Sequence, residues 1–146
     1  MSFRKIVFAV DGTVYSQAAI EEGIKLASDL NATAVFLYVI SPTHVIGSLD
    51  SGILPIDVEE IELEKGKKMM EGYVDKYGKI VSVEGVIKIG DPAKEILRYV
   101  EEWKADLIVI GRHGLESFSH LIFGGVVDEV CTKSRIPVFL VPYFDK

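Results

Sequence analysis

The chain has 146 residues, of which 49% are hydrophobic and 26% charged, and its formal net charge is −6 at pH 7. This length suits one domain with a buried core, and the apolar content excludes an intrinsically disordered chain. The negative charge and the lack of a long basic stripe disfavour binding to nucleic acid or to anionic membranes.

No apolar run reaches the roughly 20 residues that span a bilayer. The first apolar run ends at Asp11, which is too early for the core of a signal peptide. The single cysteine, Cys131, cannot form an internal disulfide and is expected to pack in a helix rather than to react. We therefore expect a cytoplasmic protein.

The first half of the chain alternates continuous apolar runs with amphipathic ones. Residues 5–10 and 33–40 are β-branched, aromatic and without polar breaks, which is typical of buried strands. The segment 16–30 between them repeats apolar residues at helical spacing. Residues 41–55 are rich in Gly, Pro and Ser and are predicted to form a long loop, followed by a helix over 57–77.

The second half continues the alternation and ends on an apolar strand between prolines. The predicted elements are a strand at 80–89, a helix at 90–103, a strand at 106–111, a helix at 119–133 and a strand at 137–142.

Apolar strands that alternate with helices predict an α/β fold, in which a doubly wound, Rossmann-like, open parallel sheet carries helices on both faces. Ligands of such sheets bind beyond the carboxyl ends of the strands. Asp11, Val39 and Gly111 lie at three predicted strand ends, so they should share one crevice if the first and fourth strands are neighbours.

Glycines are concentrated after the fourth predicted strand, in the stretch GRHGLESFSHLIFGGV over 111–126. Gly111 and Gly114 could turn backbone N–H groups toward a phosphate, or could serve only as turn and packing residues. Gly124 and Gly125 are predicted to lie in the first turns or the body of the next helix. The stretch matches neither the P-loop pattern nor the GxGxxG pattern.

This stretch resembles the universal stress protein signature G-x2-G-x9-G-[S/T], in the nucleotide-binding branch of that family. VFAVDGT, LYVI, GDPAKEI, ADLIVIGRHG and IPVFLVP also resemble the family, in the expected order. The resemblance implies that residues 1–146 form one domain of this family. It further implies a five-stranded sheet of order 3-2-1-4-5, a homodimer joined through the last strand at 137–142, and ATP in the crevice.

The same resemblance assigns roles to individual residues. Asp11 would lie near the ribose and adenine, the backbone of Val39 would read the adenine edge, and the glycines would surround the phosphates. The implied nucleotide-binding residues are Asp11, Val39, Gly111, Arg112, His113, Gly114, Gly124, Gly125 and Val126.

Gly125 departs from the family pattern, which prefers Ser or Thr at that position. The missing hydroxyl removes one hydrogen bond to a charged phosphate, a loss of about 1.5–3 kcal/mol. Hydroxyls of Ser117 or Ser119 could compensate in part. We expect weakened ATP binding, with AMP or ADP affected less.

Other readings of these residues stay open at this point. Asp11 could only pin the loop before the first helix, Arg112 could be a solvated surface residue, and His113 could donate to a carbonyl. The sequence offers no strong catalytic candidate, although slow ATP hydrolysis is compatible with it.

Our leading hypothesis is a nucleotide-binding stress-response or signalling module that takes ATP, ADP or AMP, with or without Mg²⁺. The alternative is a dimeric interaction protein of the same fold without useful ATP affinity. A flavin or electron-carrier domain would share the fold class but has no specific support. The C-terminal YFDK could shield the last strand instead of a dimer partner.

Overall fold

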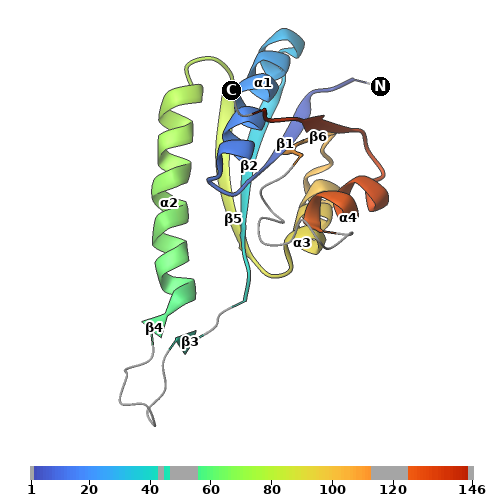
Figure 1. Cartoon of the computed structure of the whole chain (residues 1–146). Coiled ribbons are helices and arrows are strands. Elements are labelled where there is room, and N and C mark those ends of the chain that lie inside the picture. The colour runs from blue at the N-terminus through green and yellow to red at the C-terminus, as the bar shows by residue number, and fades with distance from the viewer. Residues whose placement is uncertain (1, 43–44, 47–55, 113–124, 145–146) are drawn as a thin grey trace.

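The five main strands form one all-parallel sheet in the computed structural model of the chain (Figure 1), which describes residues 2–42, 45–46, 56–112 and 125–144. The order is β5-β2-β1-β6-β7, which confirms the predicted 3-2-1-4-5 when these strands are counted along the chain. The strands are β1 (Lys5–Val10), β2 (Thr33–Ile40), β5 (Ser82–Ile89), β6 (Leu107–Gly111) and β7 (Val138–Val141).

Helices cover both faces of the sheet, as the doubly wound pattern predicts (Figure 1). One hydrophobic core lies between the sheet and α1 and α2, around Phe8 and Phe36, and the other lies under α3 and α4, around Ile96 and Ile108. The helices are α1 (Val14–Leu30), α2 (Val58–Tyr77), α3 (Pro92–Trp103) and α4 (Val126–Lys133).

Local chemistry fixes where the helices begin. The side chain of Thr13 accepts a hydrogen bond from Ser16 N at the N-terminus of α1, so this helix starts two residues before the predicted position. Asp91 accepts from Lys94 N at the N-terminus of α3, and Pro92 occupies the first turn, where its missing N–H is harmless. In both cases a helix begins shortly after the carboxyl end of a strand: α1 follows β1, and α3 follows β5.

The predicted loop at 41–55 is wrong in one respect, because it contains strand structure. β3 (Val45–Ile46) pairs antiparallel with β4 (Ile56–Asp57), and this small sheet lies at the start of α2, outside the main sheet (Figure 1). Two residues a strand are too few to give a periodicity in the sequence.

The third main strand also begins later than predicted. Ile80 N and Val81 N donate to Tyr77 O at 2.9 and 3.1 Å, so both residues close the last turn of α2 before β5 starts.

Within the described residues, no helix is both long enough and apolar enough to span a membrane.

Candidate functional site

Three strand ends meet at one edge of the sheet. The register pairs Val10 with Tyr38 and Ala9 with Ile110, so Asp11 after β1, Val39 near the end of β2 and Arg112 after β6 lie at the same level. The carboxyl ends of parallel strands define the ligand crevice of an open α/β sheet. The structure therefore brings Asp11, Val39 and Gly111 to one edge, as the sequence predicts.

Asp11 has a clear structural role at this edge. Its Oδ1 accepts hydrogen bonds from Thr13 N at 3.0 Å and from Thr13 Oγ1 at 2.6 Å, while its own N–H donates to Ser16 Oγ at 3.2 Å. These bonds hold the turn that leads into α1. Asp11 Oδ2 has no hydrogen-bond donor among the described residues, so one carboxylate oxygen can still meet a ligand.

Gly12 completes the turn after β1. Its φ is +82°, in the left-handed region that favours glycine, and a Cβ at this position would lie 3.2 Å from Met69 Sδ on α2. The backbone of β1 and the side of α2 therefore approach closely beside Asp11.

Val39 lies one residue beyond the last paired position of β1 and β2, although it still pairs with Lys88 of β5. Its half-buried side chain packs against the core under α3 and α4. The preceding Tyr38 points to the other face, where its hydroxyl donates to Glu62 Oε2 of α2 at 2.6 Å. Burial, and next the hydrogen bond to Glu62, raise the pKa of Tyr38 well above its ordinary value.

Arg112 is anchored to the end of β7. Its backbone N–H donates to Val141 O at 2.8 Å, and its guanidinium Cζ lies 5.2 Å from the ring centroid of Phe144. None of the described carboxylates lies within ion-pair distance of Arg112. Arg112 therefore brings a cation to this edge of the sheet. The contact of its guanidinium with Phe144 was not predictable from any sequence pattern.

The N-terminus of α4 corrects one expectation. Gly125 is the N-cap residue, with φ −68° and ψ −174°, and so precedes the helix instead of lying in its body. Gly125 has no side chain with which to cap the helix, so within the described residues the backbone N–H groups of the first turn have no side-chain cap from the N-cap position. Val126 begins the helix, and Asp128 and Glu129 in the same turn already complement its dipole.

Several predicted residues lie outside the described part of the chain. They are His113, Gly114, Ser117, Ser119 and Gly124. Their roles remain predictions from the resemblance.

Cys131 does not pack as expected, because its side chain is exposed on α4. Partial burial and the charge of Asp128 raise the pKa of its thiol, so thiolate formation is disfavoured. Across the described residues, no group of three His, Cys, Asp or Glu side chains is placed to hold a metal ion.

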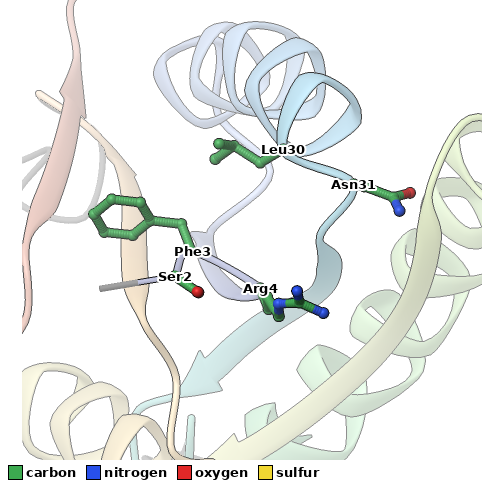
Figure 2. A pocket seen from close by; sticks show the side chains of 5 residues that line it. All are labelled: Ser2, Phe3, Arg4, Leu30 and Asn31. Atoms are coloured by element: carbon green, nitrogen blue, oxygen red, sulfur yellow. The ribbon is translucent and has the colours of Figure 1, made fainter.

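A separate hollow of about 320 Å³ lies at the amino ends of the strands, opposite the crevice. Figure 2 shows its lining by residues that precede β1 and by Leu30 and Asn31 at the end of α1. These lining residues lie at the amino end of β1 and at the C-terminal end of α1.

The sequence model of the universal stress protein family matches residues 2–142 of the chain. The chain belongs to the universal stress protein family. Universal stress protein YxiE of Bacillus subtilis is 31% identical over 146 residues, covering 95% of this chain and 99% of YxiE. The whole described fold is thus that of a universal stress protein.

Solved structures of other universal stress proteins share this fold. UspA of Lactobacillus plantarum superposes with a TM-score of 0.80 at 22% identity, covering 97% of this chain and 99% of that protein. A family member from Arabidopsis thaliana, solved with AMP bound, gives a TM-score of 0.64 at 20% identity and covers 97% of this chain and 92% of its own.

Proposed function

We propose that this universal stress protein binds an adenine nucleotide at the carboxyl edge of β1, β2 and β6 and acts as a signalling or stress-response module without strong catalysis. The observation that carries the proposal is the common level of Asp11, Val39 and Arg112 on adjacent strands. It agrees with the AMP bound to the Arabidopsis thaliana relative.

The chemistry of the three positions suits the parts of a nucleotide. A free carboxylate oxygen of Asp11 can accept from a ribose hydroxyl, and backbone groups of Val39 can meet the edge of adenine. Arg112 and the N-terminus of α4 can meet phosphate oxygens, since helix N-termini bind anions through their N–H groups. We further propose that His113, Gly114 and Gly124 complete the phosphate side.

AMP and ADP fit this site better than ATP does. Gly125 supplies no hydroxyl, and Asp128 adds negative charge to the same helix turn. Each added phosphate therefore meets fewer donors than the family signature provides. Any Mg²⁺ that accompanies ATP or ADP would have to rely mainly on phosphate oxygens and water, because the described residues offer no acidic cluster for it.

We also propose a homodimer that forms through β7. This strand is an edge of the sheet, and its Phe139 and Leu140 are 37% and 42% exposed. Apolar edge strands favour association unless something covers them. Tyr143 and Phe144 turn toward Tyr15 and Arg112 and leave Phe139 and Leu140 exposed, which argues against shielding by this part of the tail.

The exposed edge also supports the second candidate, a dimeric interaction protein with no useful nucleotide affinity. Calorimetric titration of nucleotide-free protein with AMP, ADP and ATP separates the two. Saturable binding of AMP or ADP, with GTP as the matched purine control, supports the nucleotide site. Absence of heat with all three adenine nucleotides, in a protein that is dimeric by light scattering, supports the interaction module.

A further inference from the structure

The residues after β7 reach the proposed nucleotide site. Val141 pairs with Gly111 at the end of the β6–β7 ladder, so Pro142, Tyr143 and Phe144 leave the sheet at the edge where Arg112 begins. Proline has no backbone N–H, which ends the ladder at this point. Because β7 runs parallel to β6, the C-terminal segment leaves the sheet at the same edge as Arg112.

Two aromatic contacts seat this segment. The ring of Tyr143 packs edge-to-face on Tyr15 of α1, with centroids 5.5 Å apart and planes at 90°. The ring of Phe144 lies under the guanidinium of Arg112 at 5.2 Å, although Phe144 is 70% exposed overall. An exposed phenylalanine gains little from burial here, whereas its contact with Arg112 is a favourable cation–π interaction.

A guanidinium that stacks on a ring at the 5.2 Å between Arg112 Cζ and the Phe144 centroid can still bind a ligand. In such stacking the flat face of the guanidinium meets the ring, whereas its five N–H donors point outward in the plane. Phosphate oxygens are bound by those in-plane donors. Phe144 and a phosphate can therefore contact Arg112 together, and the ring reduces the freedom that the long side chain would lose on binding.

We propose that Phe144 is a positioning residue, which holds the guanidinium of Arg112 ready for the phosphate groups of the bound nucleotide. The inference rests on the proposed nucleotide site. It assigns to the C-terminal segment a part in phosphate recognition, while adenine and ribose recognition stays with the ends of β1 and β2.

Calorimetric titration with ATP and with adenosine tests the proposal in the full chain. Phe144→Ala should weaken ATP binding about two- to fivefold, the factor that an exposed cation–π contact is worth, and should leave adenosine binding unchanged. Phe144→Tyr should retain wild-type ATP affinity. In an Arg112→Ala background, Phe144→Ala should have no further effect on ATP, since the group that it positions is absent.

A second measurement follows the contact without any nucleotide. The side-chain protons of Arg112 should resonate upfield in the wild type because of the Phe144 ring current, and should lose this shift in Phe144→Ala. The proposal is overturned by an absent upfield shift, by equal weakening of ATP and adenosine, by tighter ATP binding in Phe144→Ala, or by the same loss in the Arg112→Ala background. A wild type that binds no adenine nucleotide would instead overturn the proposed function first, and this inference with it.

Discussion

The hydroxyl of Tyr38 lies 2.6 Å from Glu62 Oε2 and donates a hydrogen bond to it. Tyr38 stands near the end of β2, directly before Val39, and Glu62 belongs to α2. The ring of Tyr38 also packs against α2 at Gly66, where a Cβ would lie 2.8 Å from Tyr38 Cδ2. This pair therefore fixes the position of α2 beside the strand that contributes to the crevice.

Tyr38→Phe should lower the free energy of unfolding at pH 7 by about 1.5–3 kcal/mol, the usual contribution of a hydrogen bond to a charged group. Glu62 is half-buried and can regain water, which favours the lower end of that range. Phenylalanine keeps the packing against Gly66, so the loss reports mainly on the hydroxyl. Urea unfolding followed by circular dichroism measures the change.

The same substitution should alter the pH dependence of stability. Burial and Glu62 raise the pKa of Tyr38 in the folded chain, so the folded state keeps this proton to higher pH than the unfolded state does. The stabilisation is fully present below about pH 10, the ordinary pKa of tyrosine, and is lost as the pH rises above it. Wild type should thus lose more stability than Tyr38→Phe above about pH 10; parallel curves for the two proteins would refute this linkage.

Asp11 and Thr13 offer a way to separate a structural role from a binding role. Asp11→Ala and Thr13→Val each remove the 2.6 Å hydrogen bond between the two side chains and should each lower stability by about 1–2 kcal/mol. Only Asp11→Ala also removes the free carboxylate oxygen. It should therefore weaken AMP binding about tenfold or more, while Thr13→Val changes it little, as measured by calorimetry.

If Thr13→Val weakened AMP binding as strongly as Asp11→Ala, Asp11 would act only by holding the turn before α1. Thr13→Ser is the matched control, because serine keeps both the hydrogen bond to Asp11 and the cap of α1.

Apolar runs in the sequence predicted the parallel sheet, because buried strands leave a pattern that needs no tertiary information, while the strand order came from the resemblance to universal stress proteins. The predicted strand ends placed Asp11, Val39 and Gly111 at one edge if the first and fourth strands were neighbours, and the resemblance added their roles. It could not reveal that Asp11 Oδ1 is bonded to Thr13, since a carboxylate two residues from a threonine forms such a turn only in some folds.

Other features depended on contacts between distant residues. Gly125 was expected in the first turns or the body of a helix, but it is the N-cap and α4 begins at Val126, since a GG pair carries no periodicity that marks a helix start. The contacts of Tyr143 with Tyr15 and of Phe144 with Arg112 join segments far apart in the chain. No local pattern in YFDK distinguishes such a segment from a solvated tail.

Gly125→Ser should strengthen ATP binding by about ten- to a hundredfold, the equivalent of one hydrogen bond to a charged phosphate, and should affect AMP less. At the N-cap of α4 serine should also add a few tenths of a kcal/mol to stability relative to glycine. Gly125→Ala is the control, because φ −68° suits alanine and the substitution adds no hydroxyl. Equal ATP affinities of the two variants, measured by calorimetry, would remove position 125 from the phosphate site.

Leu140→Glu should convert the proposed dimer to a monomer. The substitution places a charge on an edge strand whose partner would otherwise cover this 42% exposed side chain. Ile80→Glu is the matched control, since Ile80 is 56% exposed beside the opposite edge strand β5. Light scattering after size exclusion should show one chain for Leu140→Glu and two for Ile80→Glu; a monomeric wild type would contradict the proposed interface.

The most direct test of the nucleotide site is an AMP titration followed through the backbone amide resonances of the isotope-labelled chain. We expect saturable shifts concentrated at Asp11, Val39, Arg112 and Val126, with little change at Arg4 and Asn31 beside the hollow at the amino ends of the strands. Shifts concentrated at Arg4 and Asn31, or no saturable shift at millimolar AMP, would contradict adenine-nucleotide binding at the carboxyl edge of the sheet.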